Sequence, residues 1–174
     1  MTPADLLTLP PPTDGKGYEL SKGALVVRPM TGRIHEETKI TASLLVGNFA
    51  HSRDLGRVYV ETGFALSEDT ARIPDVAFVS HAKRRLRPID ETPTSLIPDL
   101  AIEVISPSEK LQSTEDKVED YLANGVPEVW QLFPRTQRLR VRTRNAIRDL
   151  SAEEFIETPT LPGFRVRVAE FFRY

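Results

Sequence analysis

The chain has 174 residues, 40% of them hydrophobic and 28% charged, with a net charge of −2 and no cysteine. This length and composition are typical of one globular domain, and we expect residues 1–174 to form it. The small net charge predicts no overall attraction to a polyanion, and the lack of cysteine excludes disulfides and thiolate metal sites.

Membrane and zinc proteins are also disfavoured. The sequence has no run of about 18 apolar residues and no basic region followed by an apolar stretch at its start, so we expect a cytoplasmic protein without membrane contact. Its three histidines, His35, His51 and His81, lack the H-x-x-x-H spacing of many zinc enzymes. An ion with oxygen ligands, Mg²⁺ or Mn²⁺, fits this composition better.

The hydrophobic pattern predicts an α/β fold with a mixed β-sheet flanked by helices. The expected elements, in chain order, are a short helix at 2–7, hairpin strands at 18–20 and 24–27, a helix at 34–51, strands at 57–66, 76–79 and 100–105, a helix at 108–124, strands at 126–133 and 138–143, and a short helix at 168–172.

Two carboxylates interrupt short apolar runs that have the pattern of buried strands. Asp75 precedes the run 76–79, and Glu103 lies within the run 100–105. Alternation places Glu103 on one face of its strand with Asp99, Ala101 and Ile105. If Asp75 lies on a neighbouring strand, the two carboxylates meet, and a hard divalent cation would offset their charge. Such a cation would also activate a water for attack on a phosphoryl group.

The lysine that would complete this pattern is supplied by the next helix and not by the strand. Position 105, two residues after Glu103, is isoleucine, whereas Lys117 shares a helix face with Tyr121, one turn further on. Spacing alone also allows Lys117 simply to cover the aromatic ring and reach solvent.

These residues together closely resemble the Uma-two family, bacterial restriction-endonuclease-like proteins of the PD-(D/E)XK nuclease superfamily. The resemblance covers roughly residues 3–172 and depends on combined spacing. The matching positions are Tyr18-Glu19-Leu20 with Gly23, His35, Pro74-Asp75, Glu103-Val104-Ile105-Ser106-Pro107-Ser108, Lys117, Tyr121, Gly125-Val126-Pro127-Glu128-Val129-Trp130 and Leu161-Pro162-Gly163-Phe164.

The resemblance implies a restriction-endonuclease-like core over about residues 18–142 and hydrolysis of DNA with Mg²⁺ or Mn²⁺. Asp75 and Glu103 then become the metal ligands. Lys117 matches a lysine that has moved from the strand to the helix, where it positions or polarises the attacking water. A homodimer is common among such nucleases, and the apolar Phe171-Phe172 tail is a candidate for its interface.

Two departures from the family pattern lie near these positions. The family often has an aspartate four residues before the lysine, where this chain has Ser113. Where the family tends to Tyr-Trp-Leu-Val-Asp-Pro, this chain has Val-Trp-Gln-Leu-Phe-Pro at 129–134. Neither departure changes Asp75, Glu103 or Lys117.

Three further residues are candidates for substrate binding. Glu19 either approaches the cleft from the hairpin or is an exposed hairpin carboxylate. His35, near a helix start, either contacts a phosphate or forms a structural hydrogen bond. Glu37 is a candidate because the superfamily often draws an acidic ligand from its first core helix, although acidic residues in a first turn also favour the helix dipole.

Arginines alternate with other residues at positions 138–144, so Arg138, Arg140, Arg142 and Arg144 share one strand face. This basic strip is a candidate phosphate track. The competing interpretation is a solvated strand face whose charges discourage edge pairing.

Two other functions remain open. One is a non-catalytic binding or regulatory module that keeps the nuclease fold, with Asp75 and Glu103 paired to protein cations. The other is a metal-dependent hydrolase of small phosphoesters or nucleotides.

Overall fold

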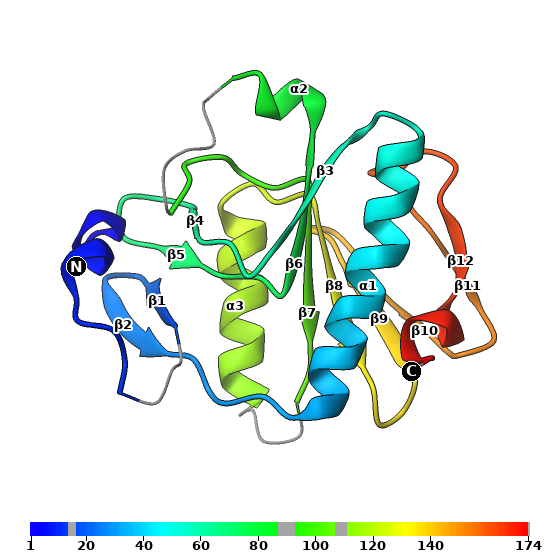
Figure 1. The fold of residues 1–174 in the computed structure, drawn as a ribbon, viewed down its shortest axis with the longest axis horizontal. Coiled ribbons are helices and arrows are strands. Elements are labelled where there is room, and N and C mark those ends of the chain that lie inside the picture. The colour runs from blue at the N-terminus through cyan, green and yellow to red at the C-terminus, as the bar shows by residue number, and fades with distance from the viewer. Residues whose placement is uncertain (14–16, 87–92, 107–110, 174) are drawn as a thin grey trace.

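In the computed structural model, a six-stranded mixed sheet lies between two long helices (Figure 1). The structure describes residues 1–13, 17–86, 93–106 and 111–173. In spatial order the strands of this sheet are β10 (Ile147–Leu150), β9 (Arg138–Arg142), β8 (Glu128–Phe133), β7 (Leu100–Val104), β6 (Val76–Ser80) and β3 (Gly56–Val60). Strands β7 and β8 are parallel, and the other neighbours are antiparallel.

A smaller sheet and a two-stranded ribbon accompany the main sheet. The smaller sheet has the order β2 (Ala24–Val27), β1 (Tyr18–Ser21), β5 (Ala71–Arg72) and β4 (Phe64–Ala65), and the ribbon pairs β11 (Phe155–Glu157) with β12 (Arg165–Arg167). The helices are α1 (Arg33–Ser52), α2 (His81–Arg84) and α3 (Leu111–Ala123), with 3-10 helices η1 (Pro3–Thr8) and η2 (Val168–Phe172). Within the described ranges, no helix is long and apolar enough to cross a membrane.

The main sheet buries both of its faces, because α1 and α3 cover opposite sides of it (Figure 1). Along β7, Leu100 and Ile102 pack in a core with α1, whereas Ala101 packs with Val118 and Tyr121 of α3. The predicted alternation at Glu103 is therefore correct, and Glu103 lies on the face covered by α3.

The pairing of β6 with β7 brings the two carboxylates together. Val76 is opposite Ile102 in the antiparallel register. Asp75, one residue before Val76, therefore faces the position of Glu103, one residue after Ile102. The condition that would let the two carboxylates meet is therefore fulfilled, with Asp75 as the residue just before β6.

Most predicted elements are present, with two differences and one part outside the described residues. The predicted strand over 57–66 is wrong as one element: β3 ends at Val60, Glu61 has a left-handed φ of 47°, and the chain crosses to the smaller sheet at β4. The sequence analysis also did not predict β5, β10, β11 and β12. The predicted start of the second long helix, 108–110, lies outside the described residues.

The expectation that Phe171 and Phe172 form a dimer surface is wrong. Their side chains are 0% and 5% exposed and belong to the core next to α1 and Trp130. The ring of Phe171 packs edge-on against Trp130 with centroids 6.1 Å apart. This tail therefore completes the core of its own chain.

We expect two glycine substitutions to have opposite effects on stability. A Cβ at Gly56 would overlap the carbonyl oxygen of Val79 on the paired strand, whereas a Cβ at Gly47 in α1 would make an ordinary 3.8 Å contact with Val58. Gly56→Ala should lower the free energy of unfolding by about 1–3 kcal/mol, the usual cost of overpacking. Gly47→Ala should raise it by about 0.5–1 kcal/mol because alanine favours a helix interior. Urea unfolding of both variants measures the difference, and a stable Gly56→Ala protein would contradict the close β3–β6 approach.

Candidate active site

Three carboxylates and one lysine from separate elements line a small cavity. Asp75 lies at the entry to β6, Glu103 on β7, Glu19 on β1 of the smaller sheet and Lys117 on α3. The cavity has a volume of about 40 Å³. That is room for a water or an ion, and too little for a nucleotide.

Lys117 joins two of the carboxylates. Its Nζ lies 2.8 Å from Glu103 Oε2 and 3.2 Å from Glu19 Oε1. The hydroxyl of Tyr121, one turn further along α3, donates a 2.7 Å hydrogen bond to Glu103 Oε1. Lys117 and Glu103 are 8% and 5% exposed, so these charges are almost fully removed from water. The alternative in which Lys117 only covers the tyrosine and reaches solvent does not fit this position.

Asp75 is held from three directions. Its Oδ2 accepts a 2.8 Å hydrogen bond from the backbone N–H of Val104 and lies 3.2 Å from His35 Nε2. Its Oδ1 has a longer contact, 3.4 Å, with the Arg28 guanidinium. Because 3.4 Å is beyond a normal N–H···O distance, Oδ1 is the oxygen with the most capacity to bind a cation.

A second group of buried ion pairs adjoins the cavity at Glu19. Arg72, 2% exposed, donates to Asp120 Oδ2 over 2.6 and 3.0 Å and to Glu19 Oε2 over 3.0 Å. Glu19 Oε1 also accepts from the backbone N–H of Ile73 at 3.0 Å. Arg72 and Lys117 thus bind different oxygens of Glu19. Glu19 is a buried site residue and not an exposed hairpin carboxylate.

Burial and the surrounding charges separate the pKa values of these groups. Burial, with the negative charges of Asp75 and Glu19, raises the pKa of Glu103 to about 7 although Lys117 opposes this rise. For Glu19 the effect of burial is outweighed by Lys117, Arg72 and Arg28, and its pKa falls below the ordinary value. Burial likewise disfavours the charged form of Lys117, but Glu103, Glu19 and Asp75 outweigh it and raise its pKa. Lys117 is therefore a fixed cation, and Glu103 is the carboxyl of this group whose protonation changes near neutral pH.

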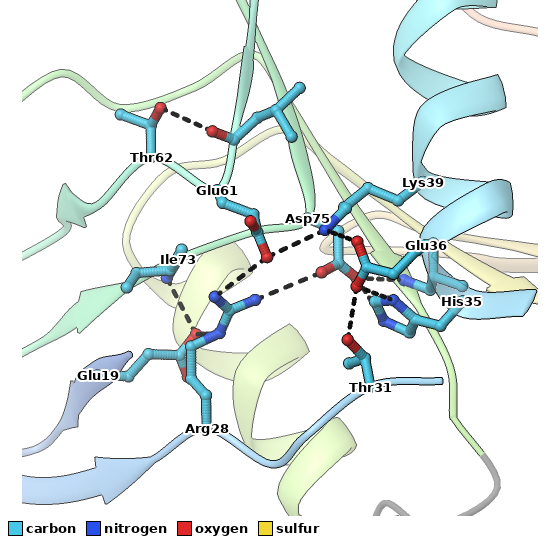
Figure 2. Close-up of polar contacts among 12 residues, drawn as sticks. Glu19, Arg28, Thr31, His35, Glu36, Lys39, Glu61, Thr62, Ile73 and Asp75 are labelled. Atoms are coloured by element: carbon cyan, nitrogen blue, oxygen red, sulfur yellow. Dashed lines mark hydrogen bonds and ion pairs between the residues drawn. The ribbon is translucent and has the colours of Figure 1, made fainter. Parts of the chain in front are cut away.

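An outer ring of charges surrounds Asp75 on the side of α1 (Figure 2). Arg28 contacts Glu61 at 3.5 Å in addition to Asp75. Lys39 bridges Glu36 and Glu61 over 2.5 and 3.1 Å. Each of these cations already has a carboxylate partner, so its charge is largely offset within the protein.

The donor set around the cavity fits a hard divalent cation. Within the described part of the chain, no group of three or more His, Asp or Glu side chains is placed to hold a metal ion by itself. Mg²⁺, however, is commonly held by one or two carboxylates together with waters and substrate phosphates. Asp75 Oδ1 and Glu103, each with lone pairs left after their present hydrogen bonds, supply such a pair.

The structure brings Glu19 and His35 to the cavity and leaves Glu37 outside it. The side chain of Glu37 is 33% exposed, and its ion pair is a 3.8 Å contact with Arg33. In a helix, residue 37 lies about 200° around the axis from His35, so the two face different directions. The neighbouring Glu36 lies nearer, 3.5 Å from His35 Nδ1.

The arginine strip lies away from the cavity on β9. Arg140 binds Asp149 at 2.6 and 3.0 Å, and Arg142 binds Glu115 at 2.6 Å. Arg138 is exposed at the start of the strand. The explanation that these charges prevent edge pairing is wrong, since β10 pairs with residues 139–142 of β9. A phosphate contact by Arg140 or Arg142 would first require breaking its ion pair.

Arg28, Arg72 and Asp120 were not expected at the site. The position of Asp120 could have been inferred from the sequence, because it lies three residues after Lys117 and one before Tyr121, on the same buried helix face. No sequence pattern indicates Arg28 or Arg72, since each reaches the site only through the packing of the smaller sheet against the main one.

The fold is similar to that of a solved protein. A crystal structure described as a putative nuclease belonging to DUF820, from Anabaena variabilis ATCC 29413, matches with a TM-score of 0.83 and 18% sequence identity over 99% of this chain and 97% of that chain. No curated protein matches this sequence. The family model of Uma2, whose description is "putative restriction endonuclease", matches residues 3–169. The resemblance seen in the sequence is confirmed, and the chain belongs to the Uma2 family.

Proposed function

We propose that this protein is a Mg²⁺- or Mn²⁺-dependent endonuclease that hydrolyses phosphodiester bonds of DNA. The observation that carries the proposal is the meeting of Asp75, Glu103 and Lys117, from three separate elements, at one buried cavity. The family's description as restriction endonucleases supports DNA as the substrate.

Asp75 and Glu103 would hold the cation. When bound, it would lower the pKa of a coordinated water and offset charge on a phosphoryl oxygen. His35 and the Val104 amide fix the orientation of Asp75, and Tyr121 fixes that of Glu103.

Lys117 has an electrostatic role in this proposal. Its raised pKa keeps it protonated at neutral pH, so it cannot accept a proton from water. It can donate a hydrogen bond to the attacking water and stabilise the charge that develops on the phosphate.

Glu103→Gln should abolish metal-dependent cleavage and leave the fold intact. The amide keeps the size of the side chain but removes the anionic ligand, so we expect a rate loss of about 10²-fold or more. The measurement is cleavage of plasmid and single-stranded DNA in Mg²⁺, Mn²⁺ and Ca²⁺. Glu119→Gln, an exposed glutamate on α3, is the matched control and should cleave normally. Full activity of Glu103→Gln would sink the assignment of this site.

Binding of Mn²⁺ should depend on pH through Glu103. The metal needs the ionised carboxylate, and the pKa of Glu103 is raised to about 7. Below pH 7 binding must therefore release a proton, and the affinity should fall about tenfold per pH unit; above pH 7 it should level off. Calorimetry in buffers of different ionisation enthalpy counts the released protons. If wild-type protein binds no Mn²⁺ at any pH, the metal-free regulatory module becomes the better explanation.

Replacing Lys117 separates stability, metal binding and catalysis. Lys117→Met leaves Glu103 and Glu19 without their shared cation, which should lower the free energy of unfolding by about 3–5 kcal/mol in the absence of metal. Mn²⁺ should bind about tenfold more tightly because the competing charge is gone, and it should restore much of the lost stability. Cleavage should stay low. Thermal unfolding with and without Mn²⁺ tests this, and a variant that Mn²⁺ fails to stabilise would contradict a metal at these carboxylates.

A further inference from the structure

The catalytic cavity is too small for substrate, so a nucleotide must enter through a neighbouring space. Two larger pockets adjoin the cavity. One, of about 340 Å³, shares His35 with it. The other, of about 360 Å³, shares Arg28, Pro29 and Thr31 with it. Each has a volume in the range of ordinary small-ligand sites.

The first of these, here called the arginine pocket, lies between the start of α1 and the ends of β7 and β8. Its described lining residues are Gly32, Arg33, Ile34, His35, Ile105, Ser106, Pro134 and Arg135. They include two arginines and no carboxylate. Arg33 is 86% exposed with only a long 3.8 Å contact to Glu37, and Arg135 is exposed with no ion pair to any other described residue.

The second, here called the glutamate pocket, has the opposite character. Its described lining residues are Gly17, Arg28, Pro29, Met30, Thr31, Glu36 and Glu61. The guanidinium of Arg28 lies 3.4–3.8 Å from three carboxylates, those of Glu19, Glu61 and Asp75 (Figure 2). The positive charge of Arg28 is already offset by these carboxylates. Glu36 and Glu61, which line the pocket, make it unfavourable for a phosphate.

The arginine pocket also lies next to Asp75, the proposed metal ligand. His35 is the third residue of α1, and its Nε2 lies 3.2 Å from Asp75 Oδ2. One side chain therefore separates the pocket from the carboxylate. The N-cap residue of α1 is Gly32, which has no side chain to cap the first turn. The backbone N–H groups of that turn therefore favour an anion nearby.

We infer that DNA enters through the arginine pocket, which binds the nucleotide next to the cleaved phosphodiester. The phosphate of that nucleotide contacts Arg33 and Arg135, and its sugar and base lie against Ile34, Ile105 and Pro134. This inference rests on the proposed nuclease function and adds the direction from which the substrate reaches Asp75.

The position of the pocket can be tested without catalysis. Thymidine 5′-monophosphate is titrated into metal-free ¹⁵N-labelled protein, with thymidine as the probe lacking phosphate. We expect amide shifts at residues 32–35 and at Arg135, much weaker with thymidine. Shifts confined to residues 28–31 and Glu61, or no shifts at millimolar nucleotide, would overturn the inference.

The role of the arginines is tested with DNA. Arg33→Gln and Arg135→Gln are combined in the Glu103→Gln background, and binding to labelled DNA is followed by anisotropy over a range of salt. The affinity should fall about tenfold or more at about 0.1 M salt, and the salt slope should decrease by about 1 for each arginine. Arg53→Gln, at the opposite end of α1, removes one arginine charge away from the pocket and should change neither quantity.

In protein with Glu103 intact, the double variant should raise KM and leave kcat nearly unchanged, because the arginines bind substrate without touching the reacting group. If wild-type protein cleaves DNA but the double variant binds and cleaves equally well, the pocket assignment fails while the nuclease proposal stands. If wild-type protein cleaves no DNA while the nucleotide shifts map to residues 32–35, the nuclease proposal fails and the nucleotide pocket stands.

Discussion

The buried ion pairs of Lys117 with Glu103 and Glu19 are the contacts on which the rest of the site depends. They join α3, β7 and β1, and so connect the main sheet to the smaller one. Breaking a buried pair is costly because it leaves an uncompensated charge away from water. Arg72 and Asp120 extend the same network, since Arg72 holds the second oxygen of Glu19. The smaller sheet therefore cannot move from the main sheet without exposing several unpaired charges, and the carboxylates stay in place before any metal binds.

This arrangement balances two requirements. The protein cations keep three acidic groups close together in a metal-free protein, where mutual repulsion would otherwise drive them apart or protonate them. The same cations oppose a divalent ion. The raised pKa of Glu103 shows that the balance is incomplete at this position, because burial and the charges of Asp75 and Glu19 exceed the effect of Lys117. Glu103 therefore loses its proton only near neutral pH, whereas Lys117 stays protonated there.

The sequence predicted the parts of the site that depend on strand geometry. Asp75 and Glu103 stood out because each interrupts an apolar run, and the alternation along β7 gave the correct face for Glu103. Lys117 came from the family resemblance and not from its spacing. Arg28 and Arg72 could not be predicted, because their partners lie on other elements and only the packing of two sheets brings them together. Glu36 lies near His35 and Glu37 does not, because successive residues of a helix point in different directions. The left-handed backbone at Glu61 ends β3, so the single strand predicted over 57–66 is two strands in the structure.

Net charge and arginine count do not identify which arginines of the folded chain are left without a carboxylate partner. The chain is slightly acidic, and within its most conspicuous basic pattern, on β9, Arg140 is paired with Asp149 and Arg142 with Glu115. A cation that already contacts a carboxylate offers little to a phosphate, because the pair must be broken first. Arg135 and Arg33 are separated by about a hundred residues in sequence, yet they line one pocket beside His35 with at most one long ion-pair contact in the described structure. The attraction of an arginine for a phosphate thus depends on its ion pairs as well as on its position, and the sequence does not give those pairs in advance.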